Sequence, residues 1–166
     1  MYNIGDQVVY GIHGVCRVAG FDKQVVNRKT VTYLVLEPIG QDGSRYMVPT
    51  SSEIAMSKLH PVLSSCEMEA LLLSDEVRQD VWIREENLRK QTYRELIASG
   101  NRLEILKMVN SLYVHKRKQQ EAGKKFHLAD DNFLRDAEKL LSSEISVVMN
   151  CSFEEARAYL REKLTV

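Results

Sequence analysis

The chain has 166 residues, of which 44% are hydrophobic and 28% charged, a balance typical of a globular protein rather than a disordered one. Its 23 basic and 23 acidic side chains give a formal net charge of zero, which excludes a polycation that binds nucleic acid through bulk charge. No apolar run approaches a membrane span, and no charged leader with an apolar core opens the chain, so we expect a protein that is neither membrane-bound nor exported. The three cysteines are widely spaced and form no CxxC pair, which predicts neither a disulfide framework nor a zinc site and fits the cytoplasm.

Glycine and proline divide the chain into two parts. All three prolines and six of the eight glycines lie within the first 61 residues. Both residue types mark strands and turns and are poor inside helices, so their distribution predicts a β-rich part followed by a helical part. We expect one domain at 1–61 and a second at 62–166.

Short segments rich in Val, Tyr, Ile and Thr fill the first part, each bounded by turn-forming residues, as is typical of strands. So few short strands cannot form a large sandwich, and a small, bent, Tudor- or SH3-like barrel is the compact solution. The fold class we predict is therefore α+β, with this barrel followed by an all-helical bundle. The expected strands are 7–12, 15–21, 25–36 and 45–49, with a hairpin loop at 40–43.

Helix signals dominate the second part. Gly100 suits a left-handed C-cap, Asn101 with Glu104 has N-cap and capping-box spacing, and Ser152 with Glu155 forms a second capping box. Apolar residues recur with helical periodicity between these signals. The expected helices are 67–73, 76–97, 102–121, 130–149 and 153–163, packed as a small bundle.

Positive charge is concentrated in the middle of the chain. Eleven basic and five acidic side chains lie in 82–125, whereas 61–81 and 126–166 are net acidic. Solvated helix faces are the commoner reason for such a cluster. The alternative is a polyanion partner, and the acidic flanks then predict weak, salt-dependent binding that needs something else to hold the protein near nucleic acid.

Trp82 is the single tryptophan and stands where the acidic segment gives way to the basic one. A lone tryptophan is most often a core anchor. Its neighbours Val81 and Ile83 are able to fill the core instead, which leaves Trp82 near the surface beside Arg84. An exposed aromatic ring next to cations can stack on bases or wedge between them. Composition leaves both interpretations open.

Residues 4–15 (IGDQVVYGIHGV) resemble the opening signature of the CarD/CdnL family of bacterial transcription regulators. That N-terminal module is shared with the RNA-polymerase-interacting domain of the transcription-repair coupling factor. Further matches are residues 33–36 (YLVL), Val48-Pro49, the segment around Trp82, and residues 98–101 (ASGN) before a long basic helix. The resemblance covers residues 2 to about 163.

The resemblance implies that the barrel docks on the β subunit of bacterial RNA polymerase. It also implies that the helical domain contacts promoter DNA at the upstream edge of the melted bubble and stabilises the open complex, with Trp82 as a minor-groove wedge and a preference for forked DNA. We expect a monomer in the cytoplasm, associated with the nucleoid through the polymerase. The implied DNA-binding residues are Trp82, Arg84, Arg89, Lys90, Lys124 and Lys125. In the barrel, Gln24 and Met47 stand where some relatives use arginines, and Lys23 and Arg45 lie one and two positions away, so these four are the implied polymerase contacts.

Three other classes of function compete with this interpretation: an enzyme, a methyl-lysine or peptide reader, and an RNA-binding adaptor. No catalytic, metal-binding or cofactor motif is evident; His13 and Cys16 are three apart but lack a third partner, so we expect a non-enzyme. A Tudor-like barrel is able to read methyl-lysine if three of its rings converge around a cavity. An RNA-binding adaptor with basic helices is the remaining alternative. The rings concerned are Tyr10, Phe21, Tyr33 and Tyr46.

Overall fold

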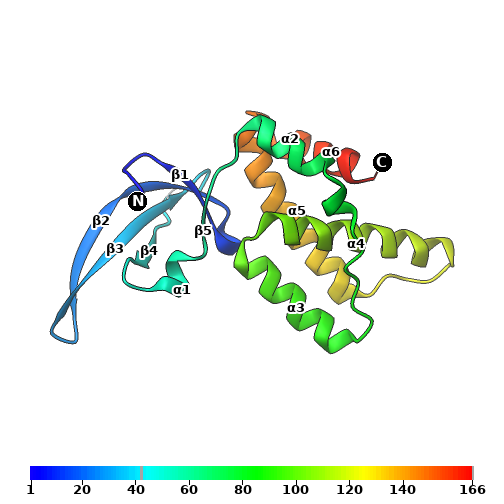
Figure 1. The fold of residues 1–166 in the computed structure, drawn as a ribbon, viewed down its shortest axis with the longest axis horizontal. Helices are drawn as coiled ribbons and strands as arrows, with labels where there is room; N and C mark the ends of the chain where they lie inside the picture. The colour runs from blue at the N-terminus through cyan, green and yellow to red at the C-terminus, as the bar shows by residue number, and fades with distance from the viewer. Residues whose placement is uncertain (42, 166) are drawn as a thin grey trace. The chain divides into compact units, whose positions relative to one another are not determined.

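The computed structural model describes residues 1–41 and 43–165, and the chain divides into two compact units, Met1–Val62 and Leu63–Val166. The first unit is a five-stranded antiparallel sheet and the second is helical, which confirms the α+β class (Figure 1). The predicted hairpin loop at 40–43 includes Asp42, which lies outside the described residues. In the described chain, no helix is long and apolar enough to cross a membrane.

The strand order is β4-β3-β2-β1-β5. Valines and leucines on one face of the sheet build its core, among them Val18, Leu34, Leu36 and Val48, all at most 1% exposed. A β-bulge between Val18 and Gly20 shifts the register of β2 against β3 and bends the sheet. The strands are β1 (Gln7–Tyr10), β2 (Val15–Val26), β3 (Lys29–Pro38), β4 (Tyr46–Pro49) and β5 (Leu59–Pro61), with a 3-10 turn at Gly11–His13.

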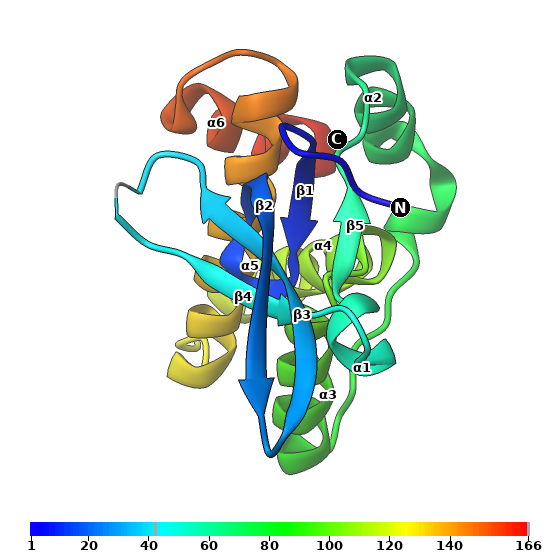
Figure 2. The same cartoon turned by 90° about the vertical axis from the view of Figure 1, so that its left-hand side faces the viewer.

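The predicted barrel is wrong in one respect: the sheet is open, because the hydrogen-bonded order ends at β4 on one side and at β5 on the other. The chain between these two short strands forms a single-turn helix that the sequence analysis missed, α1 (Glu53–Met56), capped by the Ser52 hydroxyl (Figure 2). Ala55 and Met56 of α1 pack against the core of the sheet. A helical turn therefore covers apolar surface that strand pairing covers in a closed barrel.

The predicted strand at 25–36 is interrupted by a turn. Asn27 and Arg28 both have positive φ, 51° and 63°, between the paired residues Val26 and Lys29. This is the two-residue hairpin geometry that matches the twist of the flanking strands. β2 and β3 thus form one long hairpin, visible in Figure 1 as the blue ribbon that extends past the other strands.

The second unit packs around the long helix α5, which contacts α2, α3, α4 and α6. The buried core of this unit includes Leu106, Leu112, Leu141 and Leu160. Gly100 is the predicted left-handed C-cap with φ 69°, and Asn101 and Ser152 cap the helices that follow them. Ser152 forms the predicted capping box with Glu155, whereas the amide of Asn101 donates to the Ser99 hydroxyl and not to Glu104. The helices are α2 (Ser65–Leu73), α3 (Glu86–Ser99), α4 (Arg102–Glu121), α5 (Leu128–Val148) and α6 (Phe153–Leu164), with a 3-10 turn η2 (Asp75–Arg78).

The helix predicted at 76–97 is wrong over its first ten residues. The chain leaves η2 at Arg78, runs without helical structure through 79–85, and enters α3 at Glu86. The Glu85 carboxylate starts α3 by accepting from the backbone amides of Asn87 and Leu88. Trp82 therefore stands on a segment without regular structure and not on a helix.

Candidate nucleic-acid interface

The segment 79–85, which we call the tryptophan segment, is attached to α4 by hydrogen bonds. The backbone amide of Val81 donates to the hydroxyl of Ser111 at 2.8 Å. The amide of Trp82 donates to the carboxylate of Asp80, whose other oxygen lies 3.0 Å from Nε2 of His115. These bonds hold an irregular segment in one place on the bundle.

The indole of Trp82 is half-buried and packs against the core of the helical unit. His115 stacks on it, with ring centroids 4.1 Å apart and an angle of 13° between the planes. The guanidinium carbon of Arg89 lies 4.3 Å from the indole centroid, within cation–π range. The ring is thus neither sealed in the core nor free to rotate: it is held between fixed neighbours with part of its surface exposed.

Arg89 does not lie where we expected a phosphate contact. The residue is 3% exposed, and its Nε and one terminal nitrogen each donate to Asp130 at 2.9 Å. The remaining terminal nitrogen donates to the carbonyls of Ile83, at 2.9 Å, and Arg84, at 3.4 Å. The hydrogen bonds to Asp130 also raise the pKa of Arg89. The guanidinium of Arg89 is thus directed at partners inside the protein and not at the surface.

The other cations of this region differ in their availability. Arg84 on the tryptophan segment, and Lys124 and Lys125 after α4, are exposed, and none of these three side chains forms an ion pair within the described residues. Lys90 is half-buried and bonds Glu86 at 2.8 Å, a pairing that lowers the pKa of Glu86. Of the expected DNA contacts, the side chains open to a polyanion are therefore Arg84, Lys124 and Lys125. Arg94, Arg117 and Lys118 of the same basic stretch are exposed as well.

Residues that sequence reasoning missed complete the surroundings of Trp82. His115, Ser111 and Asp130 come from α4 and α5, far from Trp82 in the chain. No local motif marks them, since their relation to Trp82 is created by helix packing. Only Asp80, two residues before Trp82, carries a local signal, an acidic side chain placed to accept the Trp82 amide.

A second candidate surface is the face of the sheet opposite its core. Side chains alternate between faces along a strand, and residues opposite each other on antiparallel strands share a face. Gln24 pairs with Val31 and Met47 with Val35, so both lie on the non-core face, where the Gln24 amide approaches the Met47 sulfur at 3.9 Å.

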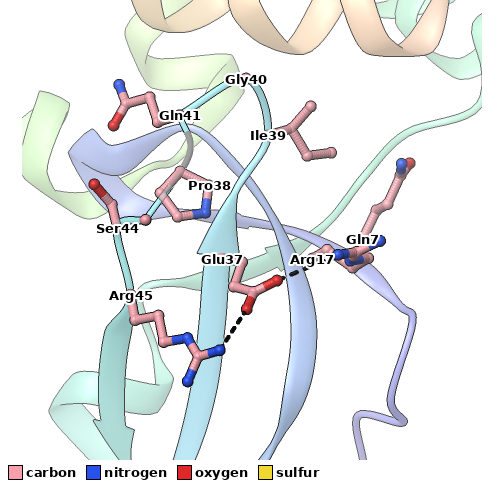
Figure 3. Close-up of a pocket in the computed structure, with 10 residues that line it drawn as sticks. Gln7, Arg17, Glu37, Pro38, Ile39, Gly40, Gln41, Ser44 and Arg45 are labelled. Carbon is pink, nitrogen blue, oxygen red and sulfur yellow. Dashed lines mark hydrogen bonds and ion pairs between the residues drawn. The ribbon is translucent and has the colours of Figure 1, made fainter.

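The four expected polymerase contacts do not share one surface. Lys23 pairs with Thr32, which places it on the other face of the sheet from Gln24 and Met47. Arg45 lies on the same face as Gln24 and Met47. It forms an ion pair with Glu37 at 3.2 Å, and Glu37 forms a second ion pair with Arg17, also at 3.2 Å (Figure 3). The structure brings three of the four together and separates Lys23.

Glu37 and its two ion-pair partners, Arg17 and Arg45, border a cavity of about 500 Å³ in the first unit. Figure 3 shows Glu37 between the two arginines, with the loop at Ile39 and Gly40 beside them. Both arginines are well exposed, at 61% and 69% of the side chain. The non-core face therefore combines an apolar centre with a charged, accessible border.

Comparison with protein-family models matches residues 2–60 to the CarD-like/TRCF RID domain and residues 70–161 to the CarD C-terminal domain. The chain belongs to the CarD family. This confirms the resemblance in both parts of the chain, and it makes the protein a transcription regulator that interacts with RNA polymerase. A comparison with curated proteins gives no match.

The CarD family is a family of non-enzymatic transcription factors. The thiol of Cys16 donates to the carbonyl of Gly14 at 3.7 Å. Cys16 is fully buried, and burial raises its pKa to about 11, so the thiolate nucleophile is disfavoured at neutral pH. Among the described residues, no group of three His, Cys, Asp or Glu side chains is arranged to hold a metal ion.

A methyl-lysine cage is also disfavoured in this CarD-family sheet. Tyr33 and Tyr46 lie on opposite faces, because Tyr46 pairs with Leu36 on the core side. Tyr10 and Tyr46 do approach each other at 6.0 Å, but His13 packs on Tyr46 with ring centroids 4.1 Å apart. Rings in contact with each other leave no gap for a quaternary ammonium group.

Proposed function

We propose that this CarD-family protein docks on the β subunit of RNA polymerase through the non-core face of its sheet and stabilises the promoter open complex through Trp82. The indole contacts DNA at the upstream edge of the bubble as a minor-groove wedge. The observation that carries the proposal is a half-buried tryptophan held on an irregular segment, two residues before the exposed Arg84, in a CarD C-terminal domain.

The state of the indole supports a wedge. An apolar side chain that inserts beside a base step must keep its shape while the DNA distorts, and a ring packed against His115 and Arg89 loses little freedom on binding. The amount of exposed ring is small, so contact with intact duplex is weak. A distorted base step at the edge of a bubble offers more surface to it.

Phosphate contacts in the proposal come from Arg84, Lys124 and Lys125, with Lys90 as a further contact once it leaves Glu86. Few phosphates are neutralised by so small a set, and the acidic segments on both sides weaken long-range attraction. We therefore expect weak binding to free DNA, with a salt dependence limited to a slope of about −0.9 for each phosphate contacted.

Docking on the polymerase compensates for this weakness. Two weak contacts in one chain reinforce each other, because the first raises the effective concentration of the second. On the sheet, Gln24, Met47 and Arg45 share a face with Val31 and Val35, whereas Lys23 does not. Since bacterial RNA polymerase works in the cytoplasm on the nucleoid, the proposal places this protein there.

Stabilisation requires a difference in affinity between two states. A ligand that binds the closed and open complexes equally shifts nothing, however tightly it binds. A wedge that fits only distorted DNA supplies the difference. A coupling free energy of about 1–3 kcal/mol changes the open population roughly 5- to 150-fold.

The test is the lifetime of a promoter open complex with the wild-type protein, Trp82→Ala and Trp82→Phe. We expect Trp82→Ala to lose most of the stabilisation and Trp82→Phe to keep part of it, while binding to the isolated β subunit stays unchanged. Forked DNA should lose affinity in Trp82→Ala more than duplex DNA or single-stranded RNA does. An equal loss of polymerase binding and open-complex lifetime would make Trp82 a fold anchor and overturn the proposal.

A further inference from the structure

A buried ion pair connects α3 and α5 directly beneath the tryptophan segment. Arg89 is 3% exposed and Asp130 is fully buried, and the guanidinium donates to both carboxylate oxygens at 2.9 Å. Asp130 lies in the first turn of α5, where the positive end of the helix dipole stabilises a carboxylate. The pair is therefore fixed in place by the two helices that carry it.

The pair is not needed simply to hold the two helices together. Two well-packed apolar side chains join helices at least as well as a buried ion pair, because burying charges costs much of what their attraction gains. An apolar residue at Arg89 is unable, however, to donate to the carbonyls of Ile83 and Arg84. Those two bonds are what the charged side chain adds.

The same guanidinium touches the indole. Its carbon lies 4.3 Å from the Trp82 centroid, while its nitrogens bind the backbone on the C-terminal side of Trp82. A guanidinium is planar and rigid, so its contacts with Asp130, with the carbonyls and with the ring are set together. The position of Asp130 in α5 therefore sets the position of the guanidinium against the indole.

We propose that Arg89, oriented by Asp130, is a positioning residue for Trp82. It fixes the tryptophan segment and the exposed part of the indole, and it makes no contact with DNA itself. The effect on promoter DNA rests on the proposed function, whereas the effect on the indole does not.

The chain contains a matched control for this pair. Arg102 in α4 bonds Glu144 in α5 at 2.6 Å, and both side chains are largely buried, at 12% and 3% exposure. This second ion pair also joins a helix to α5 and carries the same charges. Its loss should cost stability in the same way but leave the surroundings of Trp82 unchanged.

The experiment compares Arg89→Lys, Asp130→Asn and Arg102→Lys in the full chain. Trp82 is the only tryptophan, so its fluorescence reports on this one ring without a probe. We measure collisional quenching by acrylamide, unfolding in urea, the lifetime of the open complex, and the salt dependence of promoter binding. Asp130→Asn keeps the size of the side chain and serves as the second variant if Arg89→Lys does not fold.

We expect Arg89→Lys and Asp130→Asn to make the indole more accessible to acrylamide and to shorten the open-complex lifetime about tenfold, because they remove part of a coupling worth roughly 5- to 150-fold. The salt slope should stay as in the wild type, because no phosphate contact is lost. Arg102→Lys should lower stability without changing quenching.

Unchanged quenching in both variants, or equal quenching in Arg89→Lys and Arg102→Lys, overturns the positioning role. A flatter salt slope in Arg89→Lys overturns it as well, since that result returns Arg89 to the phosphate contacts. Increased quenching with an unchanged open-complex lifetime supports the positioning of Trp82 and instead contradicts the proposed function of the wedge.

Discussion

The guanidinium of Arg161 in α6 donates two hydrogen bonds, each 3.0 Å long, to the carboxylate of Glu138 in α5. The Tyr113 hydroxyl of α4 donates to the same carboxylate, and Arg157 lies 3.5 Å from it. Glu138 is 3% exposed, so three helices meet on one buried charge. Burial by itself raises the pKa of Glu138, but the bonds from Arg161 and Tyr113 and the two positive charges outweigh burial and lower the pKa overall.

The first prediction is that Glu138→Gln lowers the free energy of unfolding by about 2 kcal/mol at pH 7, as expected when hydrogen bonds to a buried charged group are lost. The pKa of Glu138 is lower in the folded protein than in the unfolded chain, where it is about 4.3. Its contribution to stability is therefore complete above that value and is lost as the pH falls through the folded pKa.

Urea unfolding of wild type and Glu138→Gln at pH 7 and at several acidic values checks this. The difference in the free energy of unfolding between the two proteins should shrink below about pH 4.3, the pKa of this carboxyl group in the unfolded chain. Glu162→Gln, on the exposed side of α6, is the control and should unfold like the wild type. A difference that is independent of pH would contradict the role of the charge.

A second prediction concerns the hairpin turn. Arg28 has a φ of 63°, a region that glycine enters without a steric penalty and β-branched residues avoid. Arg28→Gly should therefore keep or raise the melting temperature, whereas Arg28→Val should lower the stability by about 1–2 kcal/mol. Thermal unfolding followed by circular dichroism measures both. If Arg28→Val were as stable as the wild type, the turn geometry would be in doubt.

The third prediction separates the two faces of the sheet. Met47 is 40% exposed and lies on the face proposed to dock on the polymerase, so Met47→Asp should weaken binding to the isolated β subunit without unfolding the protein. Arg45→Glu should act in the same direction and also lose its ion pair with Glu37.

Lys23→Glu is the matched control, since it changes an exposed charge on the other face of the same hairpin. Titration with the isolated β subunit should give the wild-type affinity for this variant. Loss of affinity in Lys23→Glu together with wild-type binding of Met47→Asp would move the interface to the opposite face.

The fourth prediction is the salt dependence of promoter binding. Each phosphate neutralised contributes roughly −0.9 to the slope of log affinity against log salt concentration. Arg84→Ala, and Lys124→Ala combined with Lys125→Ala, should each flatten this slope, because these side chains are exposed and lack an ion-pair partner among the described residues. Lys139→Ala, an exposed lysine on α5, should leave the slope unchanged. A slope unaffected by all of these changes would place the phosphate contacts elsewhere.

Much of the fold follows from local patterns. The helix expected at 102–121 is found at Arg102–Glu121, and the one expected at 153–163 at Phe153–Leu164, because capping side chains act within a few residues of a helix end. Errors arise where a local pattern has two readings. Valines on both sides of Asn27 and Arg28 suggest one continuous strand, but a turn divides it. The apolar residues of 76–83 suggest a helix, but the chain there leaves the 3-10 turn η2 and continues without regular structure.

The sequence by itself determined the division into a β part and a helical part, the α+β class and the family, since composition, caps and the opening signature are all local properties. The surroundings of single residues near Trp82 and on the sheet were decided only by the tertiary structure. Arg89 resembles a free cation until packing places Asp130, 41 residues away, against it. Lys23 and Gln24 are neighbours in the chain, but strand register places them on opposite faces. Contacts between distant residues depend on packing and register, which no short stretch of sequence contains.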